Sequence, residues 1–550
     1  MKSFSTILYT SLFAILLVTG CSDDFLDRPS LSELNADNFY LTPDELRLAT
    51  AALYSGGPWG EWTYAAYLPV GDVLSGNMVL GYNGDAVQFN TFSVTDANGG
   101  LTATWKGMYK VIAHCNATIN GITQKSPSTI SDAIKNAALA EARFIRAYAY
   151  FNLAVLWKDV PIIEDNTLLV TSPLVPRNEV NDVYQFIVND LNFAARNLPA
   201  ADKGRATTWS AQGMLAKVYL TWAALKSPGI GQRDQALLDL AKLHAGNVCN
   251  GSGLMLLGFS FDGQGKLVID PSGYSNLFKT QYNDNQESLF SLQWHPSTSD
   301  WLSGNMLQLY SSGGQEISAS GTAGWFSISP TYDMYLQYSE GDNIRRKATF
   351  MYRGDNYPEL NAAGGGFTYA GDAGLKKHIV GTRADNSSPT MTHTSSPEHN
   401  ALLRLADVYL LYAEAIMGND TETVDMEAIK YFNKVRRRAG LDTLNNATDK
   451  LTADMLFKER RIELAAEGHF WYDLVRLYYY NSKKAIDFLN DQKERRVTFT
   501  YNADTHTATQ GNPFGDITDA SAGTFRFPLP PSEVTANPKL AEPPVPYSFK

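Results

Sequence analysis

The chain has 550 residues, of which 44% are hydrophobic and 19% are charged, so it can bury a sizeable core. The low charged fraction and the 12% of aromatic residues exclude an intrinsically disordered chain. The net charge of −11 disfavours a nucleic-acid partner, because phosphate binding needs clustered Lys and Arg. The cysteines, Cys21, Cys115 and Cys249, are too few for a disulfide framework or a cysteine zinc site.

Residues 1–20 have the pattern of a bacterial export signal. Lys2 precedes an apolar run over residues 7–18 that is too short to span a bilayer comfortably. Small residues lead into Cys21, as at a lipoprotein processing site, and the acidic stretch after Cys21 resembles a tag for the bacterial cell surface. We therefore expect Cys21 to be the acylated N-terminus of a chain anchored in the outer membrane. An ordinary secretory leader with an incidental cysteine is the alternative.

Helical spacing of apolar residues predicts the main elements of the chain. The predicted helices cover residues 132–157, 181–198, 209–224, 401–417, 426–439 and 453–466. Three of them share an Ala-x-x-Tyr-x-x-x-Ala pattern, which begins at Ala147, Ala216 and Ala406. The first two copies lie about two tetratricopeptide repeat lengths apart. This predicts helix-pair repeats at two places in the sequence that are joined in space, with chance similarity among Ala-rich helices as the alternative.

Two regions differ in composition from these helices. Residues 55–100 and 228–400 are rich in Gly, Ser, Asn and Asp and contain only short apolar runs, such as residues 287–294. This composition predicts loops and short strands. The Pro-rich tail from residue 524 is expected to pack as extended chain. The sequence thus predicts a mainly α fold with a large irregular region.

The sequence contains no nucleophile elbow, phosphate loop or zinc-protease motif. Glu459, Glu463 and Glu467 share one helix face, at a spacing that by itself would suit a glycosidase. Basic residues such as Arg460 and Arg461 are interleaved with them, and ion pairing lowers a carboxyl pKa where a general acid needs it raised. We interpret the three as structural, and we expect no catalytic residue, metal or cofactor. A glycoside hydrolase is the weaker alternative.

The ten tryptophans divide equally between the two kinds of region. Those in predicted helices, expected in the core, are Trp105, Trp157, Trp209, Trp222 and Trp471. Those in the polar regions are Trp59, Trp62, Trp294, Trp301 and Trp325. Flat rings flanked by amides and carboxylates suit a carbohydrate, whose C–H faces stack while its hydroxyls need partners. These five and Tyr82 are the predicted glycan platform, although for any single ring the core is the alternative.

Several motifs together resemble the SusD/RagB family of outer-membrane lipoproteins. They are Cys21 with residues 25–27, the W-x-x-x-Y stretch at 105–109 with Asn116, residues 141–151, 204–209, 404–414, 435–441, 459–460 and 467–469. Residues 528–533 and 537–538 also fit, whereas residues 541–543 depart from the family's usual ending. The resemblance covers nearly the whole chain after residue 20.

The resemblance implies a single domain over residues 21–550 that is not an enzyme. A tetratricopeptide-like scaffold would cover about residues 101–226 and 400–480, and a ligand-binding region about residues 55–100 and 228–400. Such proteins bind oligosaccharide or polysaccharide and cover a SusC-like TonB-dependent transporter. The family does not fix the ligand-binding residues, so the platform rests on sequence context alone. A peptide-binding relative and a purely structural lid are the alternatives within this fold.

Overall fold

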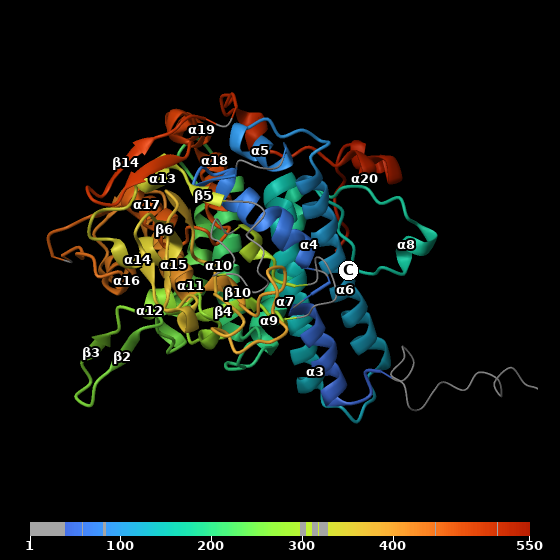
Figure 1. Cartoon of the computed structure of the whole chain (residues 1–550). Helices are drawn as coiled ribbons and strands as arrows, with labels where there is room; N and C mark the ends of the chain where they lie inside the picture. Colours follow the sequence, from blue (N-terminus) through green and yellow to red (C-terminus); the bar gives the residue numbers. More distant parts are fainter. Residues whose placement is uncertain are drawn as a thin grey trace, which may run out of the picture.

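The computed structural model describes residues 39–549 except 55, 58, 81–83, 297–303, 311–316, 318–327, 446 and 514. Helices dominate the described residues, and each sheet among them has only two strands (Figure 1). The mainly α class predicted from the sequence is confirmed.

Long helices from the first half of the chain form one side of the scaffold. They are α6 (Gly99–Lys125), α7 (Asp132–Trp157), α9 (Val180–Asn197), α10 (Thr208–Leu225) and α11 (Gln235–Gly251), and each packs on the next (Figure 1). The Ser131 side chain caps α7 by accepting from the Ile134 amide. The last turns of α7 are buried all round, which explains their continuous apolar sequence.

The second set of helices packs against the first. It comprises α15 (Leu405–Met417), α16 (Met426–Arg438), α17 (Ala453–Glu463), α18 (Phe470–Tyr480) and α19 (Ser482–Asp491). Helix α10 contacts α15 and α18. Gly213 admits the Val408 side chain, and Lys217 Nζ lies 2.9 Å from an Asp407 carboxylate oxygen. The prediction that the two helical regions join in space is therefore confirmed.

Two helix boundaries differ clearly from the prediction, and the first is the end of α17 at Glu463 instead of residue 466. The predicted helix over residues 401–417 begins only at Leu405, because Asn400–Arg404 forms strand β10. This strand pairs antiparallel with β4 (Ser288–Leu292), which lies within the predicted strand or loop segment at 287–294. Tertiary pairing overrides a helical apolar pattern here.

The expectation of loops and strands is wrong over much of residues 59–80. This stretch forms α4 (Gly60–Trp62), the π-helical turns η2 (Thr63–Tyr67) and η3 (Pro69–Val73), and a short strand, β1 (Met78–Leu80). Almost all of it is buried. The Asp72 carboxylate, in η3, accepts hydrogen bonds from the Ala466 and Gly468 amides at 2.9 and 2.8 Å. These bonds hold the π-helical turns against the chain that follows α17.

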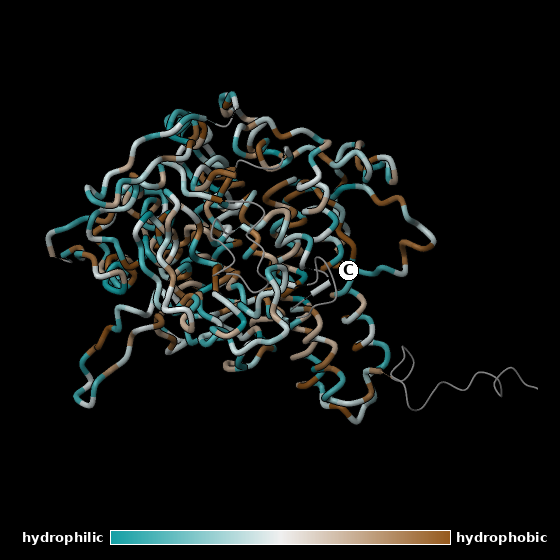
Figure 2. The backbone as a smooth tube through the Cα atoms, in the orientation of Figure 1, coloured by the Kyte–Doolittle hydropathy of each residue, from teal (hydrophilic) through white to brown (hydrophobic). Residues whose placement is uncertain are grey.

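The expectation of loops and strands over residues 228–400 is wrong for α11, whereas short paired strands and turns make up most of the described chain between residues 252 and 400. The pairs are β2 (Phe259–Phe261) with β3 (Leu267–Ile269), β5 (Ile328–Pro330) with β1, β6 (Phe350–Tyr352) with β9 (Ala373–Leu375), and β7 (Asn356–Tyr357) with β8 (Phe367–Thr368). The β2–β3 hairpin projects from the body, as does the loop carrying α8 (Leu168–Thr171), and both carry hydrophobic residues (Figures 1 and 2). The largest buried hydrophobic cluster draws on residues from Leu53 to Leu540.

Candidate functional site

Three predicted platform rings, Trp59, Trp62 and Trp294, lie in the hydrophobic core. Their exposed fractions are 0%, 3% and 4%. The Trp59 Nε1–H donates to the Leu53 carbonyl at 2.7 Å, and its ring meets Trp62 edge to face at 5.7 Å between centroids. Trp62 packs on Gly107, where a Cβ would come within 3.1 Å of the Trp62 Cβ. The prediction of an exposed platform is wrong for these three rings, because their segments fold inward.

The other predicted residues, Tyr82, Trp301 and Trp325, lie outside the described residues, as does the predicted lipidation site Cys21. Their assignment stays a prediction. Among the tryptophans expected in the core, Trp105, Trp157, Trp222 and Trp471 are buried. Trp209 is only half-buried, so its expected core position is wrong in part.

The described residues next to Tyr82 and Trp325 lie side by side. Strand β1 pairs antiparallel with β5, with Leu80 opposite Ile328. Residues 81–83 therefore start where residues 318–327 end. Trp294, which precedes residues 297–303, is held by its Nε1–H donating to Asn400 Oδ1 at 2.7 Å. These contacts fix the positions of described residues that flank the segments with the predicted rings.

Tyr64 and Tyr310 form an aromatic pair among the described residues, and Tyr310 directly precedes residues 311–316 in the sequence. The two rings are stacked with centroids 6.3 Å apart, and the Tyr310 hydroxyl donates to the Tyr64 carbonyl. Tyr64 is half-buried and was missed by sequence reasoning. The sequence spacing could have indicated Tyr64, because it follows Trp62 by two residues. Two residues apart on a helix point to roughly opposite sides, so Tyr64 faces away from the side on which Trp62 is buried.

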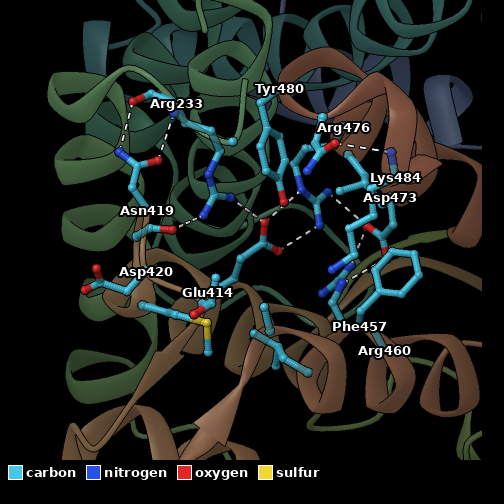
Figure 3. Close-up of a pocket in the computed structure, with 18 residues that line it drawn as sticks. Arg233, Glu414, Asn419, Asp420, Phe457, Arg460, Asp473, Arg476, Tyr480 and Lys484 are labelled. Atoms are coloured by element: carbon cyan, nitrogen blue, oxygen red, sulfur yellow. Dashed lines mark hydrogen bonds and ion pairs between the residues drawn. The ribbon is translucent and has the colours of Figure 1, made fainter. Parts of the chain in front are cut away.

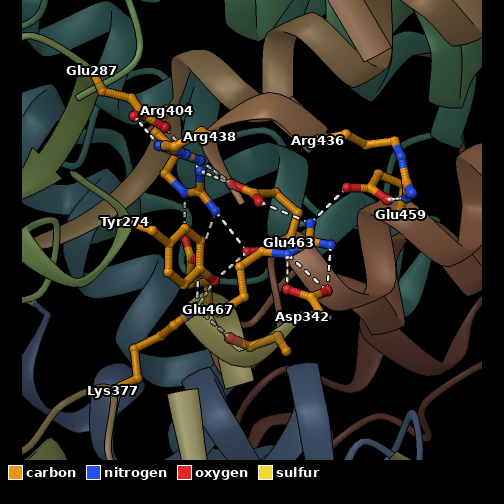
Figure 4. Close-up of polar contacts among 12 residues, drawn as sticks. Tyr274, Glu287, Asp342, Lys377, Arg404, Arg436, Arg438, Glu459, Glu463 and Glu467 are labelled. Carbon is orange, nitrogen blue, oxygen red and sulfur yellow. Dashed lines mark hydrogen bonds and ion pairs between the residues drawn. The ribbon is translucent and has the colours of Figure 1, made fainter. Parts of the chain in front are cut away.

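Glu459, Glu463 and Glu467 belong to a buried ion-pair network (Figure 4). The Glu463 carboxylate lies 2.8 Å from Arg404 Nη1 and 3.2 Å from Arg345 Nη1, and it also pairs with Arg438. Burial by itself would raise the pKa of Glu463, but these guanidinium groups hold it below the ordinary value. The pKa of Glu467 is lowered in the same way, although burial opposes the effect of Arg404 and Lys377.

Glu459 completes this side of the network, with oxygens 2.6 Å from Arg345 and 3.1 Å from Arg436. The structural role predicted for these three carboxylates is confirmed, because each is paired and buried. A general acid would need a raised pKa, so the lowered values of Glu463 and Glu467 give no support to hydrolysis.

A pocket of about 150 Å³ opens where α15 and α18 meet the segment before α17 (Figure 3). Most of its charged groups are paired with one another. Glu414 lies between Arg233 and Arg476, at 2.7 and 2.8 Å, and Asp473 lies 2.8 Å from Arg460. Such pairing leaves mainly apolar walls and few polar groups for a ligand.

Within the described ranges, no group of three or more His, Cys, Asp or Glu side chains is arranged to hold a metal ion. The same residues include no helix with the length and apolar character needed to cross a bilayer.

Comparison with known proteins places this fold in a family. A family model described as the SusD family matches residues 286–545, and a model described as starch-binding associating with outer membrane matches residues 24–220. A SusD-like protein of Bacteroides ovatus is 36% identical over 553 residues, which cover 97% of each chain. SusD-like protein P2 of Formosa agariphila is 27% identical over 514 residues, covering 85% of this chain and 90% of the relative.

Solved structures agree with these sequence matches. A crystal structure with xylogluco-oligosaccharide superposes with a TM-score of 0.81 at 36% identity and covers 92% of this chain and 99% of the other. A laminarin binding SusD-like protein superposes with a TM-score of 0.63 at 23% identity, covering 90% of this chain and 98% of the other, and shares the fold. The buried helix pairs, the sequence motifs and these matches lead to one conclusion: the chain belongs to the SusD family.

Proposed function

We propose that this protein binds a plant-type β-glucan with xyloglucan-like side chains, and that it delivers the captured glycan to a SusC-like TonB-dependent transporter. The likeness to the structure solved with xylogluco-oligosaccharide, at 36% identity over nearly the whole chain, carries the proposal. Tyr82, Trp301 and Trp325 form the proposed platform.

Chain geometry supports a common platform for Tyr82 and Trp325. Tyr82 follows Leu80 by two residues and Trp325 precedes Ile328 by three. A chain advances at most about 3.6 Å per residue, and paired strands lie about 5 Å apart. The Cα atoms of Tyr82 and Trp325 are therefore no more than about 25 Å apart, which is within reach of one oligosaccharide.

Isothermal titration of residues 22–550 with xylogluco-oligosaccharide tests the ligand, with starch and laminarin fragments for comparison. Two or three stacked rings predict dissociation constants between micromolar and millimolar, since stacking is worth about 1–3 kcal/mol per ring. Replacing Tyr82, Trp301 and Trp325 together with Ala should weaken binding by about a hundredfold or more without changing the melting temperature. The buried Trp59 is the matched control, because Trp59→Phe should lower the melting temperature and leave the affinity unchanged. Full affinity in the triple variant would contradict the platform.

Membrane attachment and the transporter partner complete the proposal. The match to the family model described as starch-binding associating with outer membrane supports this location. Cys21→Ala in the full chain should release the protein from the membrane fraction and remove the acyl mass from its N-terminal peptide. Unchanged fractionation would contradict lipidation at Cys21. Co-purification with a neighbouring SusC-like barrel, lost when that barrel is deleted, tests the partner.

A further inference from the structure

A groove of about 260 Å³ lies where residues 200–209 face residues 284–291. Trp209 lines it from the first turn of α10, and Arg205, Asp284 and Gln286 line it as well. The Trp209 ring is half-buried, and its edge lies beside Gly251, where a Cβ would be 3.7 Å away. A partly accessible aromatic residue thus lies in a concave surface that presents both polar and apolar groups.

Several polar groups of the groove have hydrogen-bonding capacity left. Within the described part of the chain, neither the Trp209 Nε1–H nor the exposed Lys203 ammonium has a partner. Gln286 donates through Nε2 to the Leu256 carbonyl at 3.0 Å, which leaves its Oε1 available. Asp284 uses Oδ1 with His399 Nδ1, at 3.0 Å, and keeps Oδ2.

The charges of the groove favour a neutral ligand. Arg205 is already paired with Glu141 at 3.0 Å, and Asp202 with Arg47 at 2.8 Å. The charges that remain, the ammonium of Lys203 and the carboxylate of Asp284, have opposite signs and cancel. A ring face together with separate donors and acceptors is the chemistry that recognises a pyranose.

We propose that this Trp209 groove is a second carbohydrate-contacting site, which holds one or two sugar rings of the polymer bound at the platform. The inference rests on the proposed function. Ser291, which lines the groove from strand β4, and Trp301 are ten residues apart in sequence, so the chain between them spans at most about 36 Å. A long glycan that occupies both gains avidity that a short one lacks.

The direct test uses ¹⁹F NMR of the protein labelled with 5-fluorotryptophan, with the Trp209 resonance assigned from Trp209→Phe. Xylogluco-oligosaccharide should shift the Trp209 resonance in the variant with Ala at 82, 301 and 325. In the wild-type platform, Trp209→Phe and Lys203→Ala should each weaken binding of long xyloglucan by about fivefold or more. Both should leave the affinity for a short oligosaccharide within twofold. Lys203 is exposed, so Lys203→Ala keeps the test valid if changes at Trp209 disturb folding.

The outcomes separate the two proposals. A Trp209 resonance that does not move while the wild-type platform binds glycan overturns the groove and leaves the proposed function intact. Equal losses for long and short glycans also overturn it. A wild-type chain that binds no glycan at all contradicts the proposed function and the groove together.

Discussion

Arg404 shows how single residues hold the two halves of this fold together. It lies at the end of β10 and reaches Glu287, beside β4, and Glu463 and Glu467, in and after α17, at 2.9, 2.8 and 2.7 Å. All four side chains are almost fully buried. A buried charge is tolerated only when it is paired and hydrogen-bonded, so these residues depend on one another.

Glu463→Gln should therefore destabilise the protein strongly. It leaves Arg345, Arg404 and Arg438 with one negative charge too few, and breaking a buried pair costs about 3–5 kcal/mol. Urea unfolding should show a lower midpoint. The matched control is Lys450→Gln, which breaks the exposed pair with Glu422 and should cost about 1 kcal/mol or less. Similar effects of the two changes would contradict a supporting role for the network.

His469 should make stability depend on pH. Burial, with help from the nearby Lys217 ammonium, lowers its pKa to about 3. The unfolded state, with a His pKa of about 6.5, then takes up a proton that the folded state does not, so stability falls as the pH drops from 6.5 towards 3. The loss should approach about 1.4 kcal/mol per pH unit for this residue.

Urea midpoints measured between pH 7 and pH 4.5 test this slope above the range where most carboxylates titrate. His469→Gln should flatten the slope. Part of the slope should remain in this variant, because burial also lowers the pKa of His244, to about 4. An equal slope in the variant and the wild type would show that His469 is not the responsible group.

At the scale of elements, local signals predicted most of the long helices, but they missed α11, which lies in the region expected to form loops and strands. The helix at Asp132–Trp157 has the predicted bounds, since its apolar stripe and Pro161 are both local features. The start of α15 could not be predicted, because residues 400–404 become a strand only through pairing with β4, more than a hundred residues earlier. The inward fold of Trp59 and Trp62 depends equally on distant partners such as Gly107 in α6.

Gly71 tests how tightly the π-helical turns pack. A Cβ there would lie 2.3 Å from the Gly468 Cα, which is backbone and cannot turn away. Gly71→Ala should therefore destabilise the protein by about 1–3 kcal/mol or more, although Ala favours helical backbone. Gly84→Ala, in α5 (Gly84–Thr91), is the control, because nothing lies within 4 Å of its Cβ position and its effect should be neutral or stabilising. A stable Gly71→Ala protein would show that the two backbones can separate.

On the scale of the whole molecule, the family and the mainly helical class followed from motifs spread along the chain, whereas the ligand site did not. Loop composition predicts that a tryptophan lies outside the helices, but whether its ring points inward depends on the surface it meets. Trp294 and Trp209 show both errors, because the first is buried although it lies in a polar loop and the second is only partly buried although it lies in a helix.

The C-terminal tail closes the molecule by returning to its first helices. The Phe527 amide donates to the Leu156 carbonyl at 3.1 Å, and Trp157 Nε1–H donates to the Pro528 carbonyl at 2.8 Å. Further along, the Val545 amide donates to the Arg177 carbonyl at 2.9 Å. The tail thus covers the end of α7 and the chain just before α9, although it follows the second set of helices in the sequence.

Removing residues 526–550 should therefore loosen α7 and α9 before α16, which these contacts do not reach. Buried donors and acceptors left without partners cost about 1–3 kcal/mol each, and Trp157 loses its cover. Hydrogen exchange followed by mass spectrometry should show faster exchange over residues 150–157 and 178–190, with little change over residues 426–438. A shorter deletion, of residues 548–550, keeps the contacts of Phe527, Pro528 and Val545 and should exchange like the intact chain. If both deletions left α7 and α9 protected, the tail would be a passive covering, and the first helices would be stable through their own packing alone.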